Sequence, residues 1–395
     1  MALLAIATGI SSCSDNDKVE TPAPNPDPVN STILVYAVAT NSLSGNLVSD
    51  KNEMLLAAPY IDLDNNNVLI FETKYQYVEQ TNSYIGAVNL LKLVKNEDKY
   101  EWKVEKEYSP EIASLNPERI SEVINYVTEN YKAENYGLIF WSHSTGAQPF
   151  VPQRTMSLPM AFSFGQDKTT LEAEYEQINV DELADAVPDG VFDFIWFDSC
   201  YMSNIESIYQ FRGKCNTYIG YPTEVLEYGL PYDIVLPKLV GSTPDIEGAA
   251  DKFFKYYAES QYFSLRIATI AAIDMKKINS LADFCKDYYK PGVEVDYAPF
   301  IKYTRYTTGP FYDLGDYTKQ MAREQEMEID PEDWSTVLDE CVIYKAATPY
   351  DFAGRPIYPE RYSGISTHVY SFGEESDSEK FYRGLAWYGD AFNLD

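Results

Sequence analysis

Apolar runs bounded by turn residues predict buried β-strands along much of the chain. Residues 33–40 have the sequence Ile-Leu-Val-Tyr-Ala-Val-Ala-Thr, and such a run without polar alternation is typical of a strand buried on both faces. The same criteria predict strands at residues 68–73, 84–94, 100–104, 136–141, 192–197, 217–221 and 265–273, and others near 342 and 365. The polar residues 96–98 between two of these runs indicate a hairpin.

A second, helical spacing of apolar residues appears between these strands. Pro117 opens one helix at its first turn, and Ile120, Val123 and Val127 give that helix an apolar face. Asn179 is a suitable cap for a helix over residues 180–187. Further helices are predicted at residues 202–211, 231–240, 246–259, 314–323 and 332–340.

Strands and helices alternate in the centre of the chain, which predicts an α/β fold with a mostly parallel sheet and helices on both faces. We assign residues 32–275 to this α/β domain and residues 276–395, which are more helical, to a C-terminal extension packed on it. The irregular stretch 147–177 is too long for an ordinary connection, so we interpret it as a functional or processed loop.

The N-terminus has the features of a bacterial export signal. Residues 1–10 are apolar and end at Ile-Ser-Ser-Cys13, which resembles a lipobox whose cysteine is lipidated. Residues 1–13 are therefore predicted to be a lipoprotein signal peptide, although no Lys or Arg precedes the apolar run. The proline-rich residues 14–31 form a predicted tether. A lipoprotein on the outer membrane or cell surface of a Gram-negative bacterium is expected.

The charge balance narrows the classes of ligand. The formal net charge is −30, which argues against nucleic acid and anionic membrane surfaces because both need basic residues for binding. Such acidity favours cationic ligands, such as basic peptides or Ca²⁺, and it also keeps an exported protein in solution. The four cysteines other than Cys13 are too few for a disulfide scaffold.

Two residues at predicted strand ends are candidates for catalysis. The chain has only two histidines, and His143 follows the strand 136–141. Cys200 follows the strand 192–197 and precedes a predicted helix, whose N-terminus favours a thiolate. Ligands bind at the carboxyl edge of parallel sheets, so a His–Cys pair there could provide an activated nucleophile and a general acid. The alternative is a buried apolar cysteine and an unrelated histidine.

Several segments resemble the clostripain family of cysteine peptidases. Leu138-Ile-Phe-Trp-Ser-His143-Ser-Thr-Gly146 resembles the family's catalytic-histidine motif, and Phe194-Ile-Trp-Phe-Asp-Ser-Cys200-Tyr-Met202 resembles its catalytic-cysteine motif. Glu206 stands where many members have an acid. Residues 312–318 and 363–366 resemble two later motifs in the same order, so that the resemblance spans residues 33–390.

The resemblance implies a caspase-like fold, which gingipains and legumain share, and a Cys200–His143 dyad. It also implies cleavage of proteins or peptides after Arg or Lys, often with Ca²⁺, and self-cleavage between the two catalytic residues. Arg154 and Lys168 are the candidate processing sites in that stretch, and Lys168 is expected to be exposed. No organic cofactor is expected.

The implied mechanism uses the Cys200 thiolate as nucleophile and His143 to protonate the leaving amine. Backbone N–H groups of Cys200 and Ser144 would form the oxyanion hole. Family members usually have glycine where this chain has Ser144, and a positive φ there would strain a serine.

A basic substrate side chain needs a carboxylate in its pocket. Asp198 matches a family position for this role, while Glu224 and Glu227 lie near the place of an expected second acid. For Ca²⁺, residues 62–66 resemble the start of an EF-hand loop but lack its glycine and final glutamate, so a plain turn is favoured. The metal ligands remain unassigned.

Two other classes of function stay open. One is an inactive relative, a surface lipoprotein that binds peptides or partner proteins, which Ser144 and the uncertain second acid favour. The other is a different hydrolase, but the chain has neither a Gly-x-Ser-x-Gly elbow nor a His-Glu-x-x-His zinc motif. A glycosidase has no sequence signature that could test it.

Overall fold

The structure is a computed structural model that describes residues 28–78, 83–149, 163–168, 174–304, 311–373 and 375–394. The predicted signal peptide with Cys13, most of the predicted tether and Arg154 lie outside these ranges. None of the helices in the described part of the chain has the length and apolarity that crossing a membrane requires.

One mixed sheet organises the described residues. In spatial order its nine strands are β12 (Val342–Ala347), β10 (Thr269–Asp274), β9 (Cys215–Gly220), β8 (Phe192–Asp198), β5 (Ala133–Trp141), β1 (Val29–Val38), β2 (Asn66–Val78), β3 (Ser83–Asn96) and β4 (Lys99–Tyr108). The central strands from β9 to β2 pair in parallel, as predicted, while β10, β12, β3 and β4 pair antiparallel at the two sides.

The predicted two-sided burial of the central strands is confirmed by the packing of β1. Ile33 and Val35 belong to one apolar core, whereas Leu34 and Tyr36 belong to the other. This follows from the two-residue repeat of a strand, which sends successive side chains to opposite faces. A strand with helices on both sides must therefore be apolar at every position, which explains the continuous run in the sequence.

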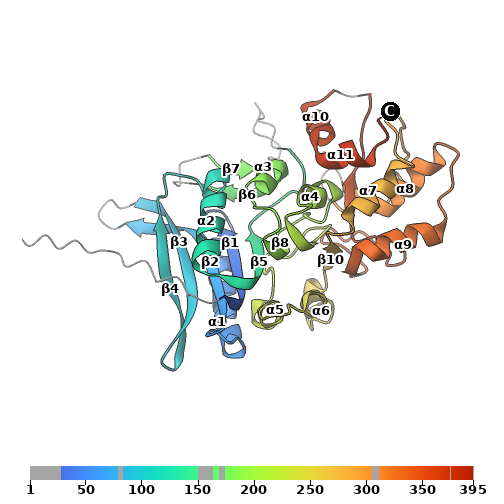
Figure 1. Cartoon of the computed structure of the whole chain (residues 1–395). Helices are drawn as coiled ribbons and strands as arrows, with labels where there is room; N and C mark the ends of the chain where they lie inside the picture. Colours follow the sequence, from blue (N-terminus) through green and yellow to red (C-terminus); the bar gives the residue numbers. More distant parts are fainter. Residues whose placement is uncertain are drawn as a thin grey trace, which may run out of the picture.

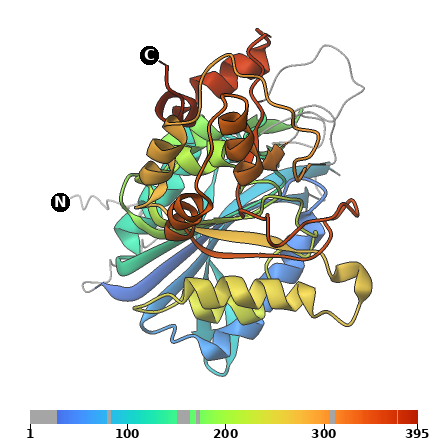
Figure 2. The ribbon, with the colours of Figure 1, turned by 90° about the vertical axis from the view of Figure 1, so that its right-hand side faces the viewer.

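Helices cover both faces of the sheet (Figures 1 and 2). On one side lie α1 (Ser44–Ala57), α5 (Tyr232–Leu239) and α6 (Ile246–Ala258), whose apolar residues share a core. On the other side lie α2 (Pro117–Asn130), α3 (Val180–Asp185), α4 (Ile205–Gln210), α7 (Ile278–Lys286), α8 (Leu314–Arg323), α9 (Pro331–Cys341), α10 (Asp377–Gly384) and α11 (Ala386–Ala391). Short 3₁₀ turns occur at η1 (Ala58–Tyr60) and η2 (Phe263–Leu265).

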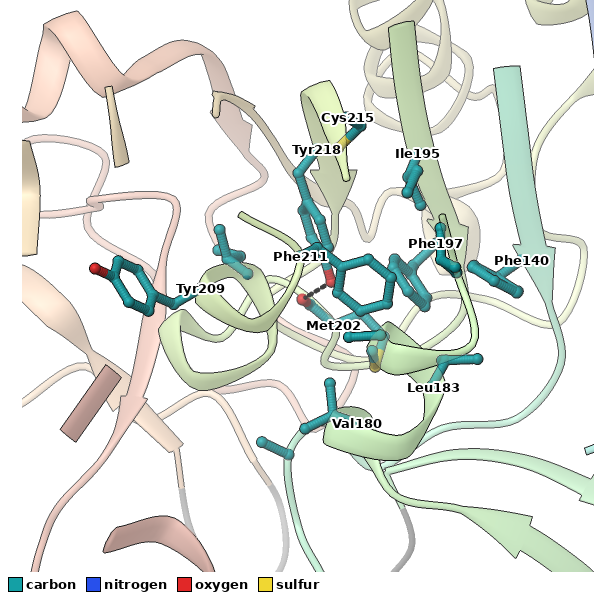
Figure 3. Close-up of a cluster of buried hydrophobic side chains, with 14 of the residues drawn as sticks. Phe140, Val180, Leu183, Ile195, Phe197, Met202, Tyr209, Phe211, Cys215 and Tyr218 are labelled. Carbon is teal, nitrogen blue, oxygen red and sulfur yellow. Dashed lines mark hydrogen bonds between the residues drawn. The ribbon is translucent and has the colours of Figure 1, made fainter. Parts of the chain in front are cut away.

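Aromatic side chains fill the core under the carboxyl end of the central strands (Figure 3). The Phe197 ring of β8 stacks on Phe140 of β5 with 5.1 Å between ring centroids, and it lies 5.2 Å from both Phe211 and Tyr218. The Tyr218 hydroxyl donates a hydrogen bond of 2.7 Å to the carbonyl of Met202, just beyond β8. These contacts support the segment that follows β8 with closely packed aromatic side chains.

The C-terminal extension is joined to the sheet rather than separate from it. Its strand β12 pairs antiparallel with β10, so that backbone hydrogen bonds join the two sides of the predicted boundary at residue 275. A two-stranded sheet forms from β11 (Phe311–Asp313) and β13 (Ser366–His368). Ser366 N donates to Ser203 O at 2.9 Å, and Ser203 Oγ donates to Gly364 O at 2.8 Å. The extension therefore supports the chain just after β8.

The predicted helix over residues 202–211 was wrong at its start, because α4 begins only at Ile205. The Asn204 side chain accepts a hydrogen bond of 2.8 Å from Ser207 N and caps the helix there. Tyr201 has a left-handed backbone with φ of 61°, which no helix accommodates. Cys200 therefore lies outside the first turn, where a helix dipole acts most strongly.

Other predicted boundaries differ as well. The tether was expected to reach residue 31, but β1 begins at Val29, which pairs with Ala133. The strand predicted over residues 265–273 begins at Thr269, after the turn η2. Part of the stretch 147–177 is regular, because β6 (Phe164–Asp167) pairs with β7 (Glu176–Ile178). Cys200, Cys215, Cys285 and Cys341 are free thiols.

We predict that Gly137→Ala destabilises the fold, because a Cβ at Gly137 in β5 would lie 2.2 Å from the Phe194 ring and 2.8 Å from Ile33 Cδ1. Overpacking of this kind costs about 1–3 kcal/mol of the free energy of unfolding. Gly45→Ala in α1 is the matched control, since nothing lies within 4 Å of its added Cβ. Urea unfolding measures both, and equal midpoints for the two variants would contradict the prediction.

Candidate active site

The two predicted catalytic residues follow neighbouring parallel strands at the same edge of the sheet. In the pairing of β5 with β8, Trp141 is opposite Asp198 at the last paired position. His143 comes two residues after Trp141, and Cys200 comes two residues after Asp198. Equal offsets from a paired position bring both residues to one place, and both line a single pocket with a volume of about 620 Å³.

The rest of this pocket comes from segments far apart in the sequence. The strand ends contribute residues 141–145 and 198–201, and the loop after β9 contributes residues 224–229. Leu43, Gln166 and Phe352 complete the lining. Phe352 belongs to the C-terminal extension, so that this extension also contributes to the pocket wall.

His143 is half-buried and has a hydrogen-bond partner. Its Nε2 atom lies 2.8 Å from the Ser42 hydroxyl oxygen, in the segment between β1 and α1. Its backbone carbonyl accepts a bond of 2.8 Å from Gly165 N at β6. Burial lowers the pKa of the imidazole, because desolvation disfavours the charged form. The ring is therefore inclined to be neutral near pH 7, which suits a group that accepts a proton from a thiol.

Cys200 is partly exposed to the pocket, in contrast to the three buried cysteines. Its Sγ atom lies 3.8 Å from the carbonyl oxygen of Val225. The next residue, Tyr201, is a buried aromatic with φ of 61°, a conformation costly for any residue with a bulky side chain. The Tyr201 N–H donates a 3.0 Å hydrogen bond to Thr223 O, which helps to hold this turn.

Ser144 does not carry the backbone strain that a positive φ would impose. Among the described residues other than glycine, only Glu97, Tyr201 and Glu326 have positive φ. The Ser144 hydroxyl instead donates a hydrogen bond to the carbonyl of Cys200. The side chain that distinguishes this chain from the usual glycine therefore joins the histidine segment to the cysteine segment.

Asp198 forms part of the pocket wall and is almost fully buried. Its carboxylate accepts hydrogen bonds from Leu230 N at 3.1 Å, from the Tyr232 hydroxyl at 3.2 Å and from the Tyr221 hydroxyl at 3.5 Å. Burial raises its pKa to about 6, and the three donors limit that rise. Asp198 is therefore mostly ionised above pH 6.

The two predicted glutamates lie in the same pocket but are less enclosed. Glu224 is half-buried and Glu227 is exposed, and both belong to the lining loop. Asn46 of α1 donates a hydrogen bond of 2.9 Å to the carbonyl oxygen of Glu227, which ties this loop to α1. Both predicted residues therefore line the pocket, on a loop that α1 supports.

Lys168, one predicted processing site, is half-buried rather than exposed. Its N–H donates a 3.0 Å hydrogen bond to Thr40 Oγ1, and its ammonium group lies 4.2 Å from the centroid of the Tyr175 ring. Because Thr40 is far from Lys168 in the sequence, the sequence did not indicate these contacts, which partly cover the lysine. Arg154, the other predicted site, lies outside the described residues.

Asp50 is a buried acid that the sequence reasoning missed. It accepts a hydrogen bond of 2.8 Å from the indole Nε1 of Trp141, the pocket residue opposite Asp198. Burial is the main cause, and the charges of Asp198 and Glu53 add to it, so that the pKa of Asp50 is raised to about 9. Its position could have signalled this, because Leu47, Asp50 and Met54 share the buried face of α1.

Glu206 and the second histidine serve a different part of the fold. The buried Glu206 carboxylate accepts hydrogen bonds from Thr367 Oγ1 at 2.8 Å and His368 N at 3.0 Å. His368 Nε2 lies 2.7 Å from Glu379 Oε1. These contacts fix β13 against α4, and none of these residues lines the pocket.

The acidic residues do not converge on a metal site in the described part of the chain, where no group of three or more His, Cys, Asp or Glu side chains is placed to hold an ion. In the predicted turn at residues 62–66, Asp62 accepts hydrogen bonds from Asp64 N at 3.2 Å and Asn65 Nδ2 at 2.8 Å. Its carboxylate is thus used within the turn.

Comparison with known proteins agrees with this geometry. A sequence profile described as the clostripain family, peptidase C11, matches residues 35–348. The chain belongs to the clostripain family. Clostripain from Hathewaya histolytica is 25% identical over an alignment of 227 residues, and the match covers 53% of this chain and 42% of that protein. The matched part is therefore less than half of that relative's length.

Two solved structures are similar over nearly the whole chain. A secreted C11 cysteine protease from Bacteroides thetaiotaomicron, in complex with an irreversible peptide inhibitor, has a TM-score of 0.74 and 25% identity over 91% of this chain and 98% of its own. An inactive zymogen C11 protease from Parabacteroides distasonis has a TM-score of 0.72 and 26% identity over 93% and 100%, respectively. The predicted family and caspase-like fold are confirmed.

We predict that Asp50→Asn stabilises the protein at pH 8. Because the pKa of Asp50 is about 9 when folded and 3.8 ordinarily, the folded protein binds a proton that the unfolded chain releases between these values. The free energy of unfolding of the wild type therefore falls as pH rises through that window. Asparagine carries no titrating proton and so avoids this loss, while its side-chain oxygen can still accept the hydrogen bond from Trp141 Nε1.

Urea unfolding at pH 8 and pH 5 measures this effect. The advantage of Asp50→Asn should shrink at pH 5, while Asp64→Asn, at an exposed position, should change little at either pH. Parallel pH dependence of the wild type and Asp50→Asn would refute the assignment of a buried, protonated Asp50.

Proposed function

We propose that this chain is an exported cysteine endopeptidase that cleaves peptide bonds after Arg or Lys through a Cys200–His143 dyad. One observation carries the proposal: Cys200, which is the partly exposed one of the four described free thiols, shares a pocket with His143 and with a buried carboxylate, Asp198. Membership of the clostripain family supports the same reaction.

In the proposed reaction, His143 takes the thiol proton and the Cys200 thiolate attacks the scissile carbonyl carbon. The oxyanion is held by the backbone N–H groups of Cys200 and Ser144. His143 then gives its proton to the departing amine, leaving a thioester on Cys200. Water activated by His143 hydrolyses the thioester and restores the thiol. The ordinary backbone of Ser144 and its link to Cys200 favour activity over the alternative of an inactive relative.

Substrate selection is assigned to the acidic side of the pocket. A lysine or arginine side chain that enters it would meet Asp198, whose three hydrogen-bond donors hold the carboxylate in place. Charge-assisted bonds formed away from water are the strong ones, so a buried acid selects a basic residue better than an exposed one. Glu224 and Glu227 would add attraction at the more exposed part of the pocket.

Self-processing, calcium dependence and export complete the proposal. Arg154 and Lys168 remain the candidate self-cleavage sites, and the similarity to a zymogen C11 protease supports processing. Ca²⁺ dependence rests on the family resemblance alone. The lipobox at Cys13 supports a lipid-anchored protein on the outer membrane or cell surface, and the similarity to a secreted C11 protease supports export.

We predict that Cys200→Ala and His143→Ala each abolish cleavage of fluorogenic peptides ending in Arg or Lys, because each removes one half of the dyad. Assays with and without Ca²⁺, and with a peptide ending in Asp, test the ion and the charge preference. Cys215→Ala is the matched control, since its thiol is buried in β9 away from the pocket. Persistent cleavage by Cys200→Ala would disprove the proposed nucleophile. No cleavage by the wild type, and no self-cleavage after incubation with Ca²⁺, would favour the inactive relative.

We also predict that Asp198→Asn lowers kcat/KM for Arg and Lys peptides by about 30-fold or more, because a buried charge pair is lost. Glu227→Gln, at an exposed acid of the same pocket, should lower it by about 5-fold or less. In the wild type, KM for basic peptides should rise as pH falls below 6, since Asp198 has a pKa of about 6 and then loses its charge. Equal losses in the two variants would contradict the assignment of Asp198.

A further inference from the structure

The hydroxyl group of Ser42 is placed against the catalytic histidine. Ser42 lies in the short segment between β1 and α1, and its Oγ atom is 2.8 Å from His143 Nε2. The residue is exposed and lines no part of the pocket. Its contact is therefore with the imidazole rather than with the region that receives substrate.

A neighbouring asparagine fixes the position of Ser42. The buried Asn41 side chain donates hydrogen bonds to Val38 O at 3.0 Å and Gln166 O at 2.9 Å. Its Oδ1 atom accepts a bond of 2.9 Å from Leu43 N, which closes a tight turn around Ser42. Asn41 Nδ2 is also 3.4 Å from the Ser142 hydroxyl, which itself donates to Val38 O at 2.9 Å. The turn that carries Ser42 is thus attached to the same segment as His143.

The chemistry of a dyad makes this contact useful. During one cycle His143 must be neutral, then protonated, then neutral again, and one ring nitrogen must stay directed at the thiol and the leaving amine. A partner on the other nitrogen fixes the ring and its tautomer. The Ser42 oxygen can accept a hydrogen bond from Nε2–H both in the neutral ring, whose other nitrogen is then free to take the thiol proton, and in the protonated ring, so it serves both states without moving.

We propose that Ser42 is a positioning residue that completes the dyad as a Ser42–His143–Cys200 arrangement. Its oxygen accepts a hydrogen bond from the imidazolium, and bonds to a charged donor are stronger than bonds to a neutral one. Ser42 therefore favours the protonated ring and opposes the lowering of the His143 pKa by burial. This inference rests on the proposed function only in that His143 acts on Cys200.

The first experiment measures the ring itself and does not depend on activity. The chain contains only two histidines, so ¹³C-histidine labelling gives two imidazole signals, and His368 serves as an internal reference. In a Cys200→Ala background, adding Ser42→Ala should lower the pKa of His143 and leave the signal of His368 unchanged. An unchanged His143 pKa and tautomer would overturn the proposal.

The second experiment uses the otherwise unmodified enzyme. Ser42→Ala should lower kcat by about 10- to 100-fold, the range of a hydrogen bond to a charged group, with KM within about 2-fold. The acid limb of the kcat/KM profile should move to lower pH, because the neutral ring that accepts the thiol proton then persists to lower pH. Ser42→Thr, which keeps the hydroxyl at an exposed position, should recover most of the loss, and Ser44→Ala, an exposed serine of α1, should match the wild type.

The outcomes separate this inference from the proposed function. Full activity in Ser42→Ala, or equal losses in Ser42→Ala and Ser42→Thr, would overturn the role of the hydroxyl. If His143→Ala were inactive at the same time, the proposed Cys200–His143 dyad would still stand. Full activity in His143→Ala would instead remove the dyad, and with it the basis for a role of Ser42.

Discussion

The site depends on one constraint, the parallel pairing of β5 with β8. Because Trp141 and Asp198 end their strands side by side, the chain must leave both strands at the same edge, and His143 and Cys200 follow at equal distances. The strands can occupy the centre of the sheet only because they are apolar on both faces, with Phe140 and Phe197 stacked on one of them. The geometry of the candidate site is thus a consequence of core packing, since neither loop could be moved without a change of register.

Two buried aspartates at or beside the pocket, Asp198 and Asp50, differ in the pH at which they ionise. Asp198 and Asp50 lie on two elements that meet at Trp141, and burial raises the pKa of both. The pKa values of the two carboxyl groups differ because their hydrogen-bond partners differ. Three donors stabilise the Asp198 carboxylate, whereas Asp50 has one donor, the indole of Trp141, and two nearby acids that disfavour its charge. One acid can therefore carry charge near neutral pH while its neighbour holds a proton, although both are aspartates removed from water.

Much of this architecture was predictable from the sequence, for reasons that also define where prediction stopped. Continuous apolar runs predicted the central strands, and their ends made His143 and Cys200 candidates, because parallel strands bring such ends together. Asp198 became a candidate through the family resemblance instead. The late start of α4 was missed because the left-handed Tyr201 and the cap at Asn204 are local backbone choices without an apolar signature. Ser42 and Phe352 were missed because they reach the site from loops 101 residues before His143 and 152 residues after Cys200, and no periodic pattern encodes such contacts.

The attachment of β13 to the segment after Cys200 sets an order of events for the maturing protein. Ser203 and Glu206 bond to residues 364–368, which begin 164 residues after Cys200. A ribosome or an export channel releases a polypeptide from its N-terminus onward, so the turn after Cys200 lacks this support until those much later residues have emerged as well. The candidate site is therefore completed late, after the strands that carry His143 and Cys200 have left the ribosome.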